Sequence, residues 1–285
     1  MLPEQNTQAW LDFRKDRIGA SDASIIMQAN PWCTPYALWL NKMGLSEPRE
    51  LSAAMQRGHD LEQKARDFFE KESRIPIYPK VVLHPVLDWM MASLDGMSAD
   101  GQTIVEIKCP GSADHSLAKK GEVPAKYIPQ LQHQMAVCQV NHMHYLSFDG
   151  TEGVILPVER DDSYIMKLVE AEMAFWDCMN TFRAPELCDR DYVQREDDIW
   201  IETAMEWGEI RNQIQVLQAR EDELRSLLTD MSGGKNCSGG GIRVSRIVRK
   251  GNIDYSAIPE IKNVYLESYR KPNTSFVKIT STMPF

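Results

Sequence analysis

The sequence lacks the features that mark membrane-spanning, exported and zinc-binding chains. None of its apolar runs approaches the roughly 18–20 residues that a bilayer-spanning helix needs. The N-terminal segment Met1–Asn6 is polar and contains no apolar core of a signal peptide. The 6 cysteines are scattered without C-x-x-C spacing, and no histidines follow at zinc-ligand spacing. We therefore expect a cytoplasmic protein with no disulfide framework, no zinc site and no membrane contact.

Positive charge is also scarce: the formal net charge is −9, which taken alone argues against nucleic acid as a partner. The basic residues are unevenly distributed, however. Residues 233–285 hold nine Lys and Arg against three Asp and Glu. A basic segment on an acidic body permits contact with nucleic acid, and acidic residues elsewhere suit a metal site built from carboxylates.

Hydrophobic periodicity predicts an α/β fold in which helices surround a short central sheet. Helices are expected after the capping residue Thr7, after Ser21 (beginning at Asp22), over 51–72, from Pro129 and over 161–182. Strands are expected near 80–84, 89–94, 103–108, 143–149 and 153–158. Residues 95–101 would join the second and third strands, with Asp100-Gly101 as the turn. We expect a core of residues 1–190 and an extension of residues 191–285.

The extension should contain a long helix followed by a small basic β region. Apolar residues alternate at spacings of three and four, interrupted by Glu221, and we interpret this seam as intramolecular packing rather than an oligomer contact. The seam residues are Trp207, Ile210, Ile214, Leu217, Leu224 and Leu228. Residues 232–241 are rich in Gly and Ser and should end the helix, and strands are expected over 242–250 and 276–280. Arg243 and Arg249 would share one strand face and, with Lys250, contact DNA phosphates, although a solvated basic strand explains them equally well.

The chemically informative segment lies around the second and third predicted strands. Alternate strand residues share a face, so Glu106 and Lys108 should point the same way, with Asp95 beside them at a strand end. Two carboxylates and the main-chain carbonyl of Ile107 suit Mg²⁺, which prefers oxygen ligands and keeps several waters. Lys108 can orient a water or neutralise charge in phosphodiester hydrolysis. Glu62, in the middle of an apolar helical stripe, is a candidate further ligand.

Each of these signals has an ordinary structural interpretation when taken alone. Asp95-Gly96 is typical of a turn, and Glu106-x-Lys108 of an exposed strand face. Ser21 is a favoured helix cap. The aromatic residues of the next segment are better explained as core than as platforms for stacked bases, namely Trp32, Tyr36 and Trp39. The order of the charged motifs and their strand context together favour a catalytic site.

Five motifs in order carry a resemblance to a known family. They are Trp10-Leu11-Asp12-Phe13-Arg14 leading to Gly19-Ala20-Ser21, Gly58-x-x-x-Glu62, Ser93-x-Asp95-Gly96, Glu106-Ile107-Lys108-Cys109-Pro110 and Tyr127-x-x-Gln130-x-Gln132. From about Trp10 to about residue 180 the sequence resembles the lambda exonuclease and YqaJ-type viral recombinase branch of the PD-(D/E)XK nucleases.

The resemblance implies a role for each matching residue. Asp95 and Glu106 correspond to the metal-binding carboxylates, and Lys108, Glu62 and Gln130 to the residues that assist catalysis. The residues that correspond to a 5′-phosphate pocket are Arg14, Ser21 and Ser93. Arginine binds phosphate with two donors, and a serine at a helix start places phosphate near free N–H groups, so this assignment is chemically sound.

The resemblance also implies a fold and an activity. The fold would be a PD-(D/E)XK core with the C-terminal helix and β region as additions. The activity would be a 5′→3′ exonuclease on linear duplex DNA, with Mg²⁺ as the cofactor and Mn²⁺ able to substitute. It would leave 3′ single-stranded tails for a single-strand annealing protein, and the chains would assemble as a ring trimer. An endonuclease on the same core and a catalytically silent binder of DNA ends are the alternatives.

Overall fold

The computed structural model describes residues 2–46, 53–252 and the single residues 254, 258, 259, 261, 264 and 269. The chain divides into two units, Met1–Val193 and Gln194–Phe285, which are described here separately. Within the described ranges, no helix combines the length and the apolar character that crossing a membrane requires.

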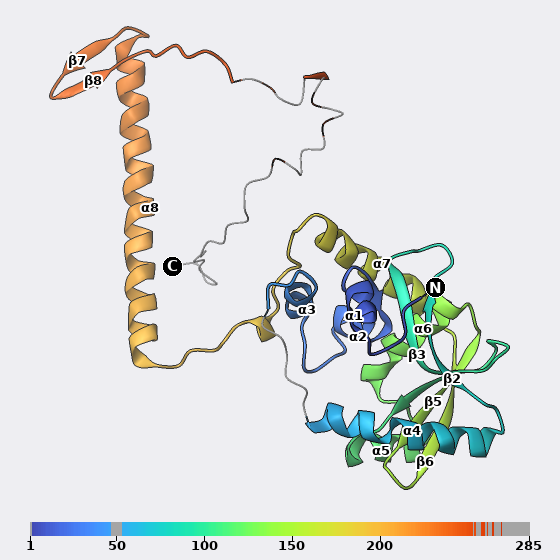
Figure 1. Cartoon of the computed structure of the whole chain (residues 1–285). Coiled ribbons are helices and arrows are strands. Elements are labelled where there is room, and N and C mark those ends of the chain that lie inside the picture. The colour runs from blue at the N-terminus through green and yellow to red at the C-terminus, as the bar shows by residue number, and fades with distance from the viewer. Residues whose placement is uncertain are drawn as a thin grey trace. The chain divides into compact units, whose positions relative to one another are not determined.

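The first unit is built around a mixed sheet of six strands (Figure 1). The strands pair in the order β1-β3-β4-β5-β6, and β2 pairs with β3. Two of the pairings are parallel, β1 with β3 and β4 with β5, and the others are antiparallel. The strands are β1 (Ile18–Gly19), β2 (Tyr78–Leu83), β3 (Met90–Met97), β4 (Ile104–Lys108), β5 (His142–Phe148) and β6 (Gly153–Glu159). This arrangement confirms the predicted central sheet of an α/β fold, and the sheet is mixed.

Two strands pair with different ends of the same edge of β3, β1 at its start and β4 at its end. At one end of β3, Met91 pairs with both β1 and β2, so these two strands lie on opposite edges. At the other end, Met97 pairs with both β2 and β4. Strands β1 and β4 therefore share one edge of β3 and leave a gap between them, beside which the candidate site lies.

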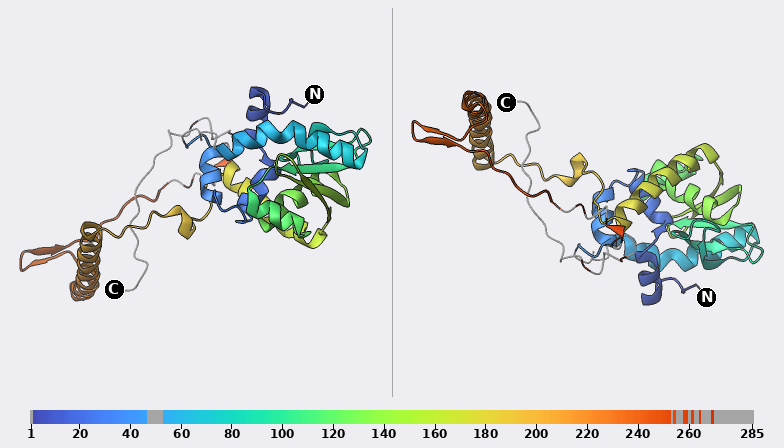
Figure 2. Two further views of the ribbon diagram at one scale, coloured as in Figure 1. Left: turned by 90° about the horizontal axis from the view of Figure 1, so that it is seen from below. Right: turned by 90° about the horizontal axis from the view of Figure 1, so that it is seen from above.

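Helices cover both faces of this sheet. Figures 1 and 2 show α4 on one side and α6 with α7 on the other. Ala65 and Phe69 of α4 pack with Val105 of β4, whereas Leu131 and Met135 of α6 belong to the larger cluster on the opposite face. The helices of this unit are α1 (Gln8–Lys15), α2 (Ala20–Ile26), α3 (Pro35–Lys42), α4 (Ala53–Ser73), α5 (Ser112–Lys119), α6 (Ile128–Cys138) and α7 (Asp162–Asn180), with short 3₁₀ turns at Ala125–Tyr127 and Asp189–Asp191.

The start of α2 differs from the prediction. Ser21 was expected to cap a helix that begins at Asp22, but α2 begins at Ala20 and Gly19 is its N-cap. The carboxylate of Asp22 accepts a hydrogen bond from the Gly19 N–H at 2.9 Å, so it satisfies a donor at the helix start. Ser21 therefore lies in the first turn, with its hydroxyl available to other partners.

The second unit contains one long helix and a hairpin. Helix α8 (Asp198–Ser232) begins at Asp197, whose side chain accepts from the Trp200 N–H at 3.1 Å, and it ends at Gly233 with φ of +54°. Glycine suits this left-handed position. Strands β7 (Cys237–Gly239) and β8 (Ile242–Val244) form the hairpin.

Three expectations for this unit need comment. The seam of α8 was interpreted as intramolecular packing, but side chains such as Ile214 and Leu217 are exposed. Strand β8 ends at Val244, so Arg243 lies in a strand whereas Arg249 lies beyond it, and the two do not share a strand face. The strand expected over 276–280 lies outside the described residues.

Candidate active site

A β-bulge in β3 positions the first carboxylate. Lys80 of β2 pairs with Leu94 and Tyr78 pairs with Met97, so Asp95 and Gly96 together oppose the single residue between them on β2. Bulges redirect side chains and are common beside active sites. Asp95 therefore lies within β3, not at the strand end that the sequence indicated. A Cβ atom at Gly96 would overlap the side chains of Ile77 and Val105, which explains a glycine inside this strand.

Glu106 of β4 is the second carboxylate, and its side chain is buried. It accepts hydrogen bonds from Lys108 Nζ at 2.5 Å and from Gln130 Nε2 at 2.5 Å. Gln134, one turn further along α6, donates to the other carboxylate oxygen of Glu106 at 2.5 Å. The contact with Lys108 confirms that these two residues of β4 point the same way. The amides of α6 therefore hold Glu106 in one orientation.

Asp95 and Glu106 lie close enough to influence each other electrostatically. Burial, reinforced by the negative charge of Glu106, raises the pKa of Asp95 well above its ordinary value. The backbone N–H of Ile107 donates to Asp95 Oδ2 at 2.7 Å, which joins the two strands at this point. Burial would lower the pKa of Lys108, but the carboxylates of Glu106 and Asp95 outweigh it and raise that pKa. Lys108 is therefore a protonated counter-ion of Glu106.

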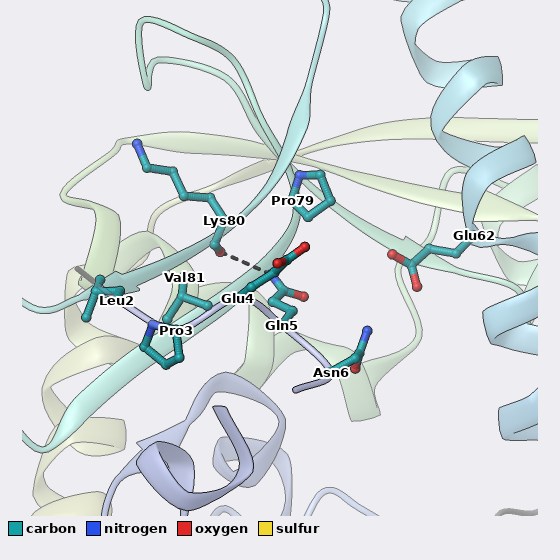
Figure 3. A pocket seen from close by; sticks show the side chains of 9 residues that line it. All are labelled: Leu2, Pro3, Glu4, Gln5, Asn6, Glu62, Pro79, Lys80 and Val81. Atoms are coloured by element: carbon teal, nitrogen blue, oxygen red, sulfur yellow. Dashed lines mark hydrogen bonds between the residues drawn. The ribbon is translucent and has the colours of Figure 1, made fainter. Parts of the chain in front are cut away.

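Glu62 reaches the same region from α4. Its Oε1 accepts from Arg66 Nη2 at 2.7 Å, and Arg66 Nε donates to the backbone carbonyl of Asp95 at 3.1 Å. Arg66 thus links Glu62 to the bulge in β3. Glu62 also borders a second hollow of about 570 Å³ between the N-terminal segment and β2, where Gln5 Nε2 donates to the Lys80 carbonyl (Figure 3).

The donor set fits a hard divalent cation. Two buried carboxyl groups lie near each other, and burial together with the charge of Glu106 raises the pKa of Asp95, a cost that a bound cation would offset. Among the described residues, no group of three or more His, Cys, Asp or Glu is placed to hold a metal ion. Two carboxylates with a main-chain carbonyl suit Mg²⁺, which retains several waters and rarely takes an all-protein cage.

The residues of the predicted 5′-phosphate pocket lie near β1 and the first half of β3. Arg14 Nη2 donates to Ser21 Oγ at 2.5 Å, and the indole N–H of Trp10 donates to Ser93 Oγ at 2.9 Å. The guanidinium carbon of Arg14 lies 5.3 Å from the centroid of the Trp10 ring, which connects the two pairs. Ser93 precedes the carboxylate-bearing bulge by two residues. The structure thus pairs Arg14 with Ser21 directly and links them to Ser93 through Trp10.

A buried ion pair supports this pocket. Asp22 contacts Arg14 Nη2 at 2.9 Å and Lys42 Nζ at 2.7 Å. Burial would raise the pKa of Asp22, but the charges of Lys42 and Arg14 outweigh it and lower that pKa. Asp22 therefore stays ionised and orients the guanidinium of Arg14.

A pocket of about 530 Å³ lies beside Asp95. Asp95, Lys108 and Glu62 line it, together with the aromatic residues Trp32 and Tyr127. Cys109 also lines it, but burial raises the pKa of its thiol to about 11, so it stays protonated at neutral pH. The chemistry of the pocket is therefore that of oxygen ligands and an ammonium group, not of a thiolate.

Comparison with known proteins agrees with this site. The model of the YqaJ-like viral recombinase domain matches residues 9–141, a range that includes every residue of the two clusters. The first unit therefore contains a region similar to the YqaJ-like viral recombinase domain. The uncharacterized protein YqaJ of Bacillus subtilis (strain 168) is 29% identical over 248 residues, which cover 78% of this chain and 77% of that protein.

Solved structures resemble the YqaJ-like unit as well. The crystal structure of LHK-Exo, an alkaline exonuclease from Laribacter hongkongensis, has a TM-score of 0.54 and 28% identity, covering 62% of this chain and 94% of that chain. The structure of LHK-Exo in complex with dAMP gives a TM-score of 0.55 and 26% identity over the same shares. The fold is therefore that of the lambda exonuclease-like PD-(D/E)XK nucleases, as the sequence resemblance implied.

Several residues of the YqaJ-like domain that touch the site were not predicted from the sequence. Gln134 contacts Glu106, Arg66 contacts Glu62, and Asp22 contacts Arg14. Gln134 lies one helical turn after the predicted Gln130, and Arg66 one turn after Glu62, so helical spacing from a known site residue was the available signal. Trp32 was assigned to the core, but its side chain is 66% exposed.

Proposed function

We propose that this protein is a Mg²⁺-dependent 5′→3′ exonuclease that acts on the ends of linear duplex DNA, with Mn²⁺ able to replace Mg²⁺. The cluster of Asp95, Glu106 and Lys108 is the observation that supports this proposal best. Its buried carboxylates suit a divalent cation, and its ammonium group lies 2.5 Å from Glu106. The match to the YqaJ-like domain model and the fold shared with an alkaline exonuclease support the same reaction class.

In this proposal the residues of the chain divide the work of phosphodiester hydrolysis. Asp95, Glu106 and the carbonyl of Ile107 hold the cation, which supplies a Lewis acid for the phosphate and a water of lowered pKa. Lys108 orients the attacking water and offsets the negative charge that develops on the phosphate. Gln130 keeps Glu106 oriented, and Glu62 orders groups at the mouth of the site.

The second cluster explains why cleavage would start at a 5′ end. Arg14, Ser21 and Ser93 offer a guanidinium and two hydroxyls, the donors that a terminal phosphate requires. An endonuclease needs no pocket for a terminus, and a silent end binder needs no Lys108 beside paired carboxylates. These features favour the exonuclease over both alternatives.

We extend the proposal to the biological setting that the family suggests. Residues 1–190 would form the nuclease core, and residues 191–285 an extension in which Arg243, Arg249 and Lys250 contact DNA phosphates. The 3′ single-stranded tails would pass to a single-strand annealing protein during phage-type recombination in the bacterial cytoplasm. The chains would act as a homo-oligomer, with the ring trimer of the family as the expected form.

Digestion of linear duplex DNA with Mg²⁺ tests the reaction, using ends with and without a 5′-phosphate. We expect phosphate-stimulated release of nucleotides from the native protein. Lys108→Ala should reduce the rate by about 10²–10³-fold, because one group that stabilises transition-state charge is worth that much. Lys119→Ala is the matched control, since Lys119 pairs with Glu152 on the surface at 2.9 Å.

Three other outcomes would contradict the proposal. Cleavage of closed circular duplex would favour an endonuclease. Absence of metal-dependent cleavage on either substrate would favour the silent end binder, and an equal loss in both lysine variants would contradict the role of Lys108.

A further inference from the structure

Trp32 is an exposed tryptophan at the catalytic pocket. Its side chain is 66% exposed, whereas the other tryptophans of the first unit are buried or partly buried. It lines the same pocket as Asp95 and Lys108. An exposed indole at a charged pocket offers a flat apolar face on which the ring of a ligand can stack.

The backbone around Trp32 is held firmly. The side chain of Asn30 accepts hydrogen bonds from the N–H groups of Trp32 at 2.8 Å and Cys33 at 3.0 Å. Arg190 Nη1 donates to the carbonyl of Asn30 at 2.8 Å, and Thr34 caps α3 by accepting from the Ala37 N–H at 3.1 Å. Trp32 therefore presents its ring from a fixed loop, which lowers the entropy lost when a ligand stacks on it.

Cations and aromatic rings alternate from Trp32 to the catalytic lysine. Lys126 Nζ lies 4.6 Å from the centroid of the Trp32 ring and 5.2 Å from that of Tyr127. Lys108 Nζ lies 5.5 Å from the centroid of Tyr127. Alternating cations and rings are the pattern that follows a nucleic-acid strand, in which phosphates and bases alternate.

We propose that Trp32 stacks on a base near the 5′ end of the strand being degraded. The phosphodiester that is cleaved would lie at the same time beside Asp95 and Glu106. This inference rests on the proposed nuclease function and adds a base-binding subsite to it. Stacking on an aromatic ring tolerates every base, because every base has a π-face. It therefore suits an enzyme that must remove nucleotides of any sequence.

Substrates that lack one base test the subsite directly. The full-length protein is assayed with Mg²⁺ on 5′-phosphorylated duplex that carries a normal nucleotide or an abasic one at the first, second or third position. With normal DNA, Trp32→Ala should raise KM about tenfold and change kcat little, because stacking binds substrate and transition state alike. When one of the three positions is abasic, the KM of the native protein should rise by about the same factor. With that substrate, Trp32→Ala should raise KM little further.

Two variants separate stacking from a structural role. Trp32→Phe keeps a flat ring and should remain within about threefold of the native KM. Tyr78→Ala removes an aromatic side chain that is 61% exposed on β2 and does not line the catalytic pocket, so it should behave as the native protein. The inference would be overturned if the effects of Trp32→Ala and of the abasic nucleotide on KM multiplied at all three positions. It would also be overturned if Trp32→Ala left KM unchanged with normal DNA.

Binding with Ca²⁺ in place of Mg²⁺ separates this inference from the proposed function. Fluorescence anisotropy of labelled duplex reports affinity without cleavage. If the native protein cleaves no DNA, the nuclease proposal fails, and the same comparison of Trp32→Ala with abasic duplex is made on Kd. A tenfold loss with normal DNA that disappears at an abasic position then supports stacking, and equal affinities overturn it.

Discussion

Glu106 receives hydrogen bonds from three side chains, and two of them are glutamines on α6. An ammonium from Lys108 balances its charge, whereas the amides of Gln130 and Gln134 only orient it. Groups that orient a metal ligand are commonly worth 10- to 100-fold in affinity or activity. Gln134 therefore contributes to the orientation of Glu106 as Gln130 does, although only Gln130 belongs to the motifs that carry the family resemblance.

Gln134→Ala should weaken binding of a divalent cation. The amide at 2.5 Å from Glu106 Oε2 would be lost, and the carboxylate would then have fewer constraints on its orientation. We expect Kd for Mn²⁺, measured by calorimetry, to rise about 10- to 100-fold, with a parallel loss of Mg²⁺-dependent cleavage.

The control is Gln132→Ala on the same helix. Gln132 is also buried, but it donates to the carbonyl of Glu159 at 2.9 Å and not to Glu106. The Gln132→Ala substitution should lower the free energy of unfolding without changing Kd for Mn²⁺ in the folded protein. Equal changes of Kd in the two variants would mean that general packing of α6, and not the contact with Glu106, sets the affinity.

The charged residues of β4 could be predicted, because strand alternation alone places Glu106 and Lys108 on one side. The partners that complete the site could not. Arg66 and Asp95 are 29 residues apart, and Gln134 and Glu106 are 28 apart, so their contacts depend on tertiary packing. Trp32 was assigned to the core from its residue type, but residue type alone does not determine whether an apolar side chain is buried in the folded protein.

At the scale of elements, most helices and strands were predictable and their ends were less so. The periods that define α4 and α7 survive in the structure because each of these helices buries one apolar face, whereas α6 is buried on all sides. Strand β3 runs further than expected. Asp95-Gly96 is typical of a turn, but here packing of Ile77 and Val105 against Gly96 keeps the pair within the sheet as a bulge.

A buried ion pair fixes α6 against α7 and β3. His133 Nδ1 lies 2.7 Å from Glu172 Oε1, and His133 Nε2 lies 2.9 Å from the carbonyl of Met91. Both ring nitrogens face acceptors, which only the doubly protonated imidazolium can satisfy. Burial would lower the pKa of His133, but Glu172 and the Met91 carbonyl outweigh it and raise that pKa.

This pair predicts a specific pH dependence of stability. Because the folded pKa of His133 lies above the unfolded value of about 6.5, its contribution is fully present below pH 6.5. It is lost as the pH rises through the raised pKa. Urea titrations at a series of pH values should therefore show that the free energy of unfolding of the native protein falls above pH 6.5.

Glu172→Gln should remove most of this slope. It should also lower the free energy of unfolding at pH 6 by about 1–3 kcal/mol, because a hydrogen bond to a charged group is lost. His142→Gln, which changes an exposed histidine on β5, is the control and should retain the native slope. A slope that persists in Glu172→Gln would assign the pH dependence to other groups.

At the scale of the whole molecule, the helices of the first unit bury apolar side chains, whereas most side chains of the α8 seam are exposed. The seam extends further than the sequence reading suggested, with spacings of three and four throughout, over Trp207, Ile210, Ile214, Leu217, Glu221, Leu224, Leu228 and Met231. Side chains along it are exposed, including Leu217 at 68%. A helix of 35 residues draws most of its stability from packing, and a heptad seam packs best against another helix with the same repeat.

A second copy of α8 offers that repeat, so the proposed homo-oligomer should depend on this seam. Glu221 does not oppose the pairing, because Arg225 Nη2 neutralises it within the same helix at 2.8 Å. Leu217→Asp places a carboxylate in the seam and should shift the mass from oligomer to monomer at micromolar concentration, as measured by sedimentation equilibrium.

Val216→Asp provides a matched control for this prediction. It adds the same charge at the neighbouring residue, whose side chain is 62% exposed, but on a face of α8 outside the seam. It should therefore keep the native mass. If Leu217→Asp also kept that mass, the contacts between copies would lie in the first unit. If both variants dissociated equally, added charge rather than the heptad register would explain the change. A seam that pairs copies of α8 requires the two neighbouring substitutions to differ, because only one of them lies where the helices would meet.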